Sequence, residues 1–463
     1  MTPEFLTPGA RRRRRWPLWV GGLLLAVCAI GAGLNLLGGD EKPPPPPVAR
    51  PAAPKPAPKP APKSVHVPSK PSTGRDWPLY GNGPGRTRHL RGVNLKPPFR
   101  RVWALNGGKL IEFQPVLAGG RLFVLKNDGR ALALSADTGK IRWRRRIGGL
   151  AASAPGAAGA SVYFVVNHGG YGGIAGSGPA KVVAMNRRTG RIRWAKRLST
   201  ASESSPLVVG ERVYVGSQSG AVYAMSTVSG RLLWRYYAGG PVKGALAYSR
   251  GRVYFGDYGG SVTALRSRNG SVAWRAGGYG QIYATPAVAF GRVYVGSKSG
   301  AVYALSAANG RRLWSRPLGG YVYAAPAVGA VRGMRPAVFI GSYSGRFMAL
   351  NARTGGVIWS RSGYGKISGA ASIIGHSVYF SSLSARRTWA LSAKTGRTLW
   401  SIGKGAFNPA ISDGKRLYIT GYGGQYAFMT PRALRHERIA LAKRRKALER
   451  RRRQLAAGQP PQS

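Results

Sequence analysis

The side chains best suited to chemistry in this chain are carboxylates, and they are few and scattered. Between residues 100 and 430 the sequence holds seven acids without a closely spaced pair: Glu112, Asp128, Asp137, Glu203, Glu211, Asp257 and Asp413. A calcium ion takes six to eight oxygen ligands, several of them from carboxylates. Because the acids are spread over distant segments, the sequence indicates neither a calcium site nor a paired acid and base.

Metal-binding and nucleophilic residues give no stronger pattern. Only His168 and His376 fall in the same stretch, far apart, and neither has a neighbouring ligand at a zinc spacing. We expect structural roles for both. The single cysteine, Cys28, lies in an apolar run, which excludes a disulfide, a CxxC pair and a haem attachment motif. No G-x-S-x-G motif marks a nucleophilic serine.

Much of the sequence consists of a repeated unit, and this unit must position any functional side chains. The stretch Arg212–Trp234 returns as Arg252–Trp274 and again as Arg292–Trp314, a period of 40 residues. Within one unit, Val213–Val215 and the residues after Gly220 are β-formers separated by glycine turns, and a short strand precedes them. Four antiparallel strands in this length are typical of one β-propeller blade.

Tryptophans mark the outer strand of each unit. They are Trp103, Trp143, Trp194, Trp234, Trp274, Trp314, Trp359 and Trp400. A stacking platform for a ligand is one interpretation, but their fixed repeat position favours a structural role in blade docking. Seven of these tryptophans follow three predicted strands. The three strands predicted in Ala406–Met429 are not followed by a tryptophan, and Trp103 is not preceded by three strands. We therefore predict eight blades, with Phe99–Leu105 completing the last one so that no edge stays open.

The segment DWPLYGNGPGRTR, which begins at Asp76, and seven copies of a Gly-x-x-x-Trp turn and strand resemble the bacterial PQQ-like repeat propellers. The resemblance covers residues 76–430 and implies an all-β propeller, similar in kind to the noncatalytic BamB-type members. Dehydrogenases of this family hold PQQ with Ca²⁺ and place a vicinal cysteine pair against the quinone. The chain lacks that pair and any cluster of carboxylates, so we expect no catalytic residue, cofactor or metal.

The N-terminal sequence predicts a membrane anchor. Residues 1–17 include five consecutive arginines at 11–15, and residues 18–37 are apolar except for Asn35. About 20 such residues match a bilayer's thickness, and the arginines should stay cytoplasmic. We predict a single-pass protein of the bacterial cell membrane with its propeller outside. A cleaved signal peptide and a lipoprotein cleaved at Cys28 are the alternatives.

Three further segments surround or interrupt the propeller. Residues 38–75 form a Pro/Ala/Lys-rich linker, for which extended polyproline II is expected. The glycine-rich insertion Asn167–Ala180 lengthens the second unit and Val331–Pro336 lengthens the sixth. Residues 431–463 are predicted to form a basic helix. Its leucines recur every seven residues, as in a coiled coil, but the second position of the coiled-coil seam is charged, which argues against dimerisation. The tail is therefore either a basic helix on an anionic surface or a solvated helix.

The charge balance indicates which partners to expect. The chain has 72 Lys and Arg against 13 Asp and Glu, a formal net charge of +59. Such a field attracts polyanions, unless the composition reflects coding bias alone. We predict a noncatalytic, membrane-tethered scaffold, monomeric, that binds envelope proteins or anionic envelope polymers. A PQQ-dependent oxidoreductase with an atypical site and a nucleic-acid-binding protein are the alternatives, the last less favoured.

Overall fold

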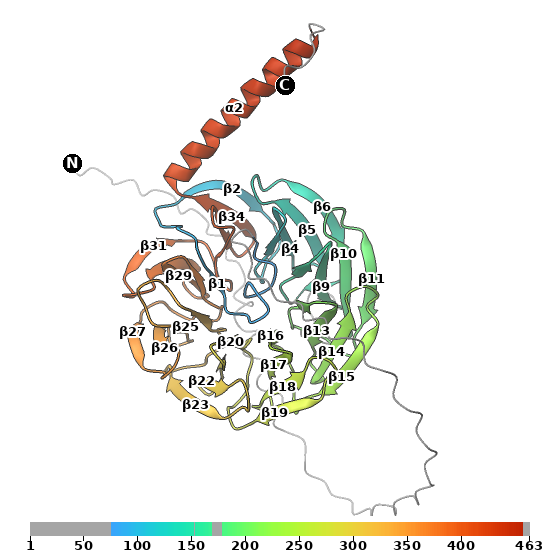
Figure 1. Ribbon diagram of the computed structural model, residues 1–463, viewed down its shortest axis with the longest axis vertical. Coiled ribbons are helices and arrows are strands. Elements are labelled where there is room, and N and C mark those ends of the chain that lie inside the picture. Colours follow the sequence, from blue (N-terminus) through green and yellow to red (C-terminus); the bar gives the residue numbers. More distant parts are fainter. Residues whose placement is uncertain (1–75, 152, 169–177, 457–463) are drawn as a thin grey trace, which may run out of the picture. The chain divides into compact units, whose positions relative to one another are not determined.

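The computed structural model describes residues 76–151, 153–168 and 178–456. They belong to one compact unit, Val67–Ser463, and a second unit, Met1–His66, lies outside them. The predicted transmembrane helix, the linker and the centre of the glycine-rich insertion also lie outside the described residues. The described strands form eight sheets. These sheets follow one another in sequence order around a ring (Figure 1). The predicted eight-bladed all-β propeller is therefore confirmed.

The blades are numbered here in chain order. Blade 1 consists of β3 (Val116–Ala118), β4 (Arg121–Leu125), β5 (Arg130–Ser135) and β6 (Ile141–Arg146). Blade 2 consists of β7 (Leu150–Ala151), β8 (Gly156–Ala158), β9 (Ser161–Asn167), β10 (Ala180–Asn186) and β11 (Ile192–Arg197). Blade 3 consists of β12 (Leu207–Val209), β13 (Arg212–Gly216), β14 (Ala221–Ser226) and β15 (Leu232–Tyr237). Blade 4 consists of β16 (Ala247–Ser249), β17 (Arg252–Gly256), β18 (Val262–Arg266) and β19 (Val272–Ala276).

The remaining blades repeat the pattern until the last. Blade 5 consists of β20 (Ala287–Ala289), β21 (Arg292–Gly296), β22 (Ala301–Ser306) and β23 (Arg312–Pro317). Blade 6 consists of β24 (Ala327–Gly329), β25 (Ala337–Gly341), β26 (Phe347–Asn351) and β27 (Val357–Arg361). Blade 7 consists of β28 (Ser372–Ile374), β29 (Ser377–Ser382), β30 (Arg387–Ser392) and β31 (Thr398–Ile402), with β1 (His89–Leu90) beside β28. Blade 8 consists of β32 (Ile411–Ser412), β33 (Leu417–Thr420), β34 (Gly424–Met429) and β2 (Arg100–Asn106).

The ring closes where the sequence predicted. Strand β2 pairs antiparallel with β34, one residue later at each end than the predicted Phe99–Leu105. Trp103 lies opposite Ala427, in the same relation as Trp234 to Ala224 in blade 3. The first long strand of the propeller therefore supplies the outer strand of the last blade, and an open edge at this point is avoided.

Seven of the eight blade tryptophans contact the turn of the following blade. From Trp103 to Trp359, seven indole Nε1 groups donate to a backbone carbonyl of the next blade at 2.8 to 3.2 Å. The ring lies against the glycine of that turn, as Trp234 does against Gly270. Gly270 has a φ of 76°, and a Cβ there would sit 2.7 Å from the indole, so only glycine fits. Trp400 instead meets Phe99 edge-on, with ring centroids 5.2 Å apart.

The segment from residue 76 to residue 90, called the inner segment below, ties the blades together from inside the ring. Its carbonyls accept hydrogen bonds from inner strands of blades 2, 4, 5, 6 and 7, and Trp77 forms a bridge with Leu117 of blade 1. Arg86 is completely buried, and its guanidinium donates to the carbonyls of Leu246 and Pro206. Burial and the neighbouring charge of Arg88 lower the pKa of Arg86 to about 9. The motif that resembled the PQQ-like family is thus a structural strap.

The chain continues from β34 into helix α2 (Pro431–Ala456), so the predicted basic C-terminal helix is confirmed. Its first turns contact β2, and Figure 1 shows it beginning beside β2 and β34. Within the described part of the chain, no helix combines the length and the apolar character needed to cross a membrane. Residues 18–37, for which a membrane helix was predicted, are not in that part.

Candidate functional site at the ring closure

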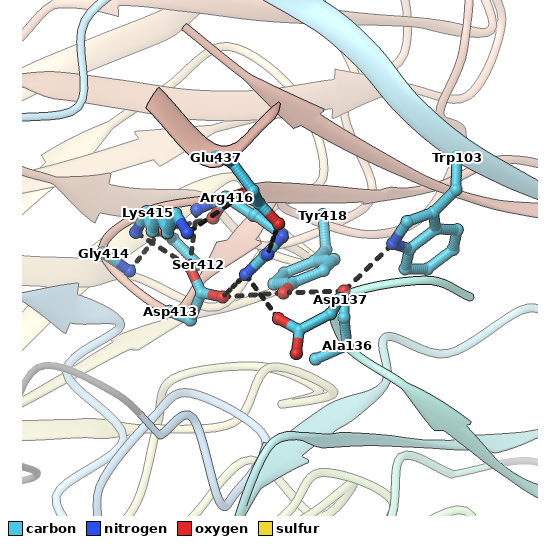
Figure 2. A network of polar contacts seen from close by, with 10 residues as sticks. All are labelled: Trp103, Ala136, Asp137, Ser412, Asp413, Gly414, Lys415, Arg416, Tyr418 and Glu437. Atoms are coloured by element: carbon cyan, nitrogen blue, oxygen red, sulfur yellow. Dashed lines mark hydrogen bonds and ion pairs between the residues drawn. The ribbon is translucent and has the colours of Figure 1, made fainter. Parts of the chain in front are cut away.

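One buried arginine gathers three acids at the junction of the first blade, the last blade and helix α2 (Figure 2). Arg416 Nη1 lies 2.8 Å from Asp137 Oδ1 and 3.3 Å from Asp413 Oδ2. Its Nη2 lies 2.6 Å from Glu437 Oε1. The Arg416 side chain is 5% exposed, whereas that of Asp137 is 66% exposed. We call these four residues the closure cluster.

A second layer of hydrogen bonds links the closure cluster to the tryptophan contact at the closing strand. The Tyr418 hydroxyl donates to Asp413 Oδ2 at 2.8 Å and lies 3.3 Å from the carbonyl of Ala136. Trp103 Nε1 donates to the same carbonyl at 3.0 Å (Figure 2). The residues that close the ring and the residues that hold α2 therefore form one connected network.

Glu437 is the residue through which the helix is held. Its second oxygen, Oε2, lies 2.9 Å from Lys415 Nζ. Burial by itself raises the pKa of Glu437, but the hydrogen bond from Lys415 and the charges of Arg416 and Lys415 outweigh it and lower the pKa below its ordinary value. A lowered acid pKa stabilises the folded state above the unfolded pKa, and this contribution is lost as the pH falls through the folded pKa. The anchor is therefore present at neutral pH.

The closure cluster modifies a contact that Arg121 and Arg252 make with the backbone of a following turn. Arg416 occupies the same place before β33 as Arg252 does at the start of β17. Arg252 Nη1 donates to the carbonyls of Ala307 and Ala308 in the next blade's turn, at 3.0 and 2.6 Å. Asp137 is the only acid at its turn position, where the other blades carry Arg188, Val228, Arg268, Ala308, Arg353 and Lys394. An acid at this turn position is the sequence signal that would have indicated the closure cluster.

Beyond its anchor, helix α2 is exposed and basic. Among the helix side chains that the structure describes, seven basic ones are exposed: Arg432, Arg435, Arg438, Lys443, Lys446, Arg450 and Arg453. Ile439 and Leu441 are each 57% exposed, so the apolar residues of this helix find no core in the propeller. The helix has two acids, Glu437 in the closure cluster and Glu449 farther along. The propeller thus holds the start of a predominantly basic helix.

A different group of polar residues comes together at inner-strand loops of blades 3 to 5. Residues 203, 243 and 283 are 40 positions apart, so they occupy the same place in successive blades. Glu203 Oε1 lies 2.9 Å from Lys243 Nζ and 3.0 Å from Gln218 Nε2. Its Oε2 accepts from the Tyr283 hydroxyl at 2.9 Å. Burial and the charges of Glu203 and Glu112 raise the pKa of Tyr283.

Glu112 is a carboxylate of this group whose pKa is shifted into the neutral range. Burial raises its pKa to about 7, against the effect of a hydrogen bond from Asn127 at 3.2 Å. Glu112 therefore binds a proton more tightly in the folded chain than in the unfolded chain.

The raised pKa of Glu112 predicts a pH-dependent stability difference. Between about pH 4.5 and 7 the folded state binds more protons at this site, so its contribution to stability falls as the pH rises. Glu112→Gln cannot ionise, so it should match the wild type at the acidic end and be more stable, by up to about 3 kcal/mol, above the window. Urea unfolding at both pH values measures the difference. An equal difference at both would contradict the raised pKa.

The other acids considered in the sequence lie apart. Asp128 pairs with Arg130 at 2.7 Å in a turn. Asp257 is fully buried, and its Oδ1 accepts the backbone N–H of Ser261. Glu211 is exposed at a turn. Among the described residues, no group of three or more His, Cys, Asp and Glu is placed to hold a metal ion.

These features define an eight-bladed propeller of the PQQ-like repeat class. The family described as outer membrane protein assembly factor BamB matches residues 93–178 and 178–402, and the chain belongs to this family. No curated protein sequence matches the chain.

Several solved structures share the fold. The BamB protein of Moraxella catarrhalis is 20% identical with a TM-score of 0.59, over 72% of this chain and 100% of that one. A europium-containing methanol dehydrogenase is 13% identical with a TM-score of 0.65, over 77% and 98%. A quinohemoprotein alcohol dehydrogenase of Comamonas testosteroni is 14% identical with a TM-score of 0.62, over 79% and 81%. At these identities the likeness shows the fold alone.

The quinoproteins among these neighbours raise the question of a quinone with its calcium ion. Two carboxylates of inner-strand loops, Glu112 and Glu203, act on each other electrostatically. Glu203 already binds Lys243, and the pKa of Glu112 near 7 leaves it partly protonated at neutral pH. Calcium needs several ionised or carbonyl oxygens around one point. This donor set does not fit a calcium ion.

Proposed function

We propose that this chain is a noncatalytic binding scaffold of the bacterial cell envelope. The observation that carries the proposal is the combination of a closed propeller with a basic helix held at its closure. The closure cluster fixes the start of α2, while seven basic side chains along the helix stay exposed. A rigid platform that presents one charged surface can bind a partner of opposite charge without chemistry of its own.

The topology of the proposal follows from the N-terminal segments. Residues 18–37 would anchor the chain in the cell membrane, and residues 38–75 would hold the propeller away from it on the outer side. Membership in the BamB family supports a scaffold that contacts other envelope components. An anionic envelope polymer, or a protein with an acidic surface, is the partner that the charge of α2 favours.

The alternative of a quinone-dependent oxidoreductase is supported by the shared fold alone. The methanol and alcohol dehydrogenases match at 13% and 14% identity. Nothing at Glu112 and Glu203 supplies the calcium ligands that such an enzyme needs. The binding role therefore has the stronger support.

Capture in the native envelope tests this function. The full chain is crosslinked in intact envelopes and compared with a variant in which four helix residues become glutamine: Lys443, Lys446, Arg450 and Arg453. The matched control neutralises four equally exposed basic residues in the blade turns: Arg188, Arg268, Arg353 and Lys394. We expect the helix variant to lose a crosslinked partner that the turn variant keeps. Retention of every partner by the helix variant would contradict the proposal.

A further inference from the structure

Two hollows flank the first turns of α2, and they differ in charge. One, of about 420 Å³, lies between β2 and the helix and is called the arginine hollow below. It is lined by Arg100, Arg101, Pro431, Leu434, Arg435 and Arg438. The other, of about 460 Å³, is lined by Lys415, Thr430, Arg432, Ala433, His436, Glu437 and Ala440. Only the second has a carboxylate, Glu437, which is bonded to Lys415 and Arg416.

Four of the six residues that line the arginine hollow are arginines, and no carboxylate is among them. All four arginine side chains are exposed, and like charges that share a site repel one another. The closure cluster holds Arg435 and Arg438 in this position, because Glu437 lies between them in sequence and is bound to Arg416. The molecule therefore maintains a concentration of positive charge that an anion would relieve.

The chemistry of arginine narrows the class of anion. A guanidinium group presents several N–H donors in a planar fork that matches the oxygens of phosphate and carboxylate. Arginines from two elements line the hollow, so an anion bound there can accept hydrogen bonds from both the strand and the helix. Arg100 and Arg101 come from β2, whereas Arg435 and Arg438 are three residues apart on one side of α2.

The basic surface continues from the hollow along the helix. At 100° and 1.5 Å per residue, Arg435, Lys446 and Arg453 fall within about 20° of one another and span about 27 Å. All three are exposed, and Glu449 is the acid near this line. A linear chain of phosphate groups would follow such a line, whereas a single free phosphate would occupy the hollow alone.

We propose that the arginine hollow binds a phosphate group of a linear phosphate-bearing polymer of the envelope, with the neighbouring helix face binding the groups that follow. This inference rests on the proposed function, because it names the chemistry of the partner. It assigns Arg100, Arg101, Arg435 and Arg438 as the binding residues.

The test measures binding of fluorescently labelled long-chain inorganic polyphosphate to the full chain in detergent, by anisotropy over a salt series. Arg435→Gln with Arg438→Gln should weaken binding on the order of tenfold and reduce the slope of log affinity against log salt by about two. The control, Arg268→Gln with Arg353→Gln, makes the same change in charge at exposed turn residues away from the hollow and should change affinity by less than about threefold.

Three results would overturn the assignment. The first is that the wild type does not bind polyphosphate. The second is that both double variants lose affinity equally. The third is that binding of phosphatidylglycerol vesicles or duplex DNA depends on Arg435 and Arg438, whereas binding of polyphosphate does not depend on them. Circular dichroism confirms that each variant is folded. Failure of the proposed function would give a different result. In that case polyphosphate binding still depends on the arginine hollow, but crosslinking in intact envelopes captures no partner of α2.

Discussion

Replacing Trp234 with alanine is expected to lower the free energy of unfolding by about 4 kcal/mol. The indole is 8% exposed, donates from Nε1 to the carbonyl of Ser267 at 3.0 Å, and lies against Gly270 of the next blade. Its ring centroid is 5.7 Å from that of Tyr214. Removing it opens a cavity between blades 3 and 4, where both sides of the contact are held by their own sheets and cannot collapse easily. Urea unfolding measures the change.

Trp234→Phe is the matched control for this contact. Phenylalanine keeps an aromatic ring against Gly270 but loses the hydrogen bond to Ser267, so a smaller loss of about 1 to 2 kcal/mol is expected. An alanine variant within about 1 kcal/mol of the wild type would show that the tryptophan contacts do not hold the blades together.

Replacing Arg416 with methionine is expected to destabilise the protein by about 3 kcal/mol and to free the start of α2. The change leaves the carboxylates of Asp413 and Glu437, which are 14% and 16% exposed, without their shared cation. Lys415 still binds Glu437, so part of the anchor survives. Hydrogen exchange at the first turns of α2 measures the release, and polyphosphate affinity should fall because Arg435 and Arg438 are no longer held beside β2.

The repeat provides a control for Arg416. Arg252→Met removes an equivalent side chain that donates to the backbone carbonyls of Ala307 and Ala308 and is bonded to no carboxylate there. We expect a loss of about 1 kcal/mol there and no change in exchange along α2. If both variants behave alike, the three acids around Arg416 contribute nothing beyond the backbone contact of the other blades.

The propeller was predictable because its pattern is local and repeated. Val213–Val215, the glycine turns and Trp234 recur at one spacing, and each unit specifies the same four strands. The closure followed from an unmatched Trp103 and an unmatched strand set, and β2 does pair with β34. The basic helix followed from composition, and it begins at Pro431 as expected.

The candidate site was not predictable in the same way. Asp137 and Arg416 stand at opposite ends of the propeller sequence, and they meet only because the ring closes. The role of Arg86 depends on the course of the inner segment past successive blades, which no local pattern reports. The group at Glu203, Lys243 and Tyr283 did leave a signal, their 40-residue spacing, but it is visible only once loop positions are compared between repeats.

We propose that the basic helix, held at the ring closure, is the surface through which the chain binds its envelope partner. A photo-crosslinking amino acid placed at Ala442 of the full chain in intact envelopes tests this directly, because Ala442 is exposed and lies within about 20° of the line of Arg435 on the helix. Val228 is the control, since it is 80% exposed in a blade turn. Identification of the adducts by mass spectrometry should find an anionic polymer or an acidic protein at Ala442 and not at Val228. No adduct at Ala442, or the same adducts at both positions, would contradict the proposal.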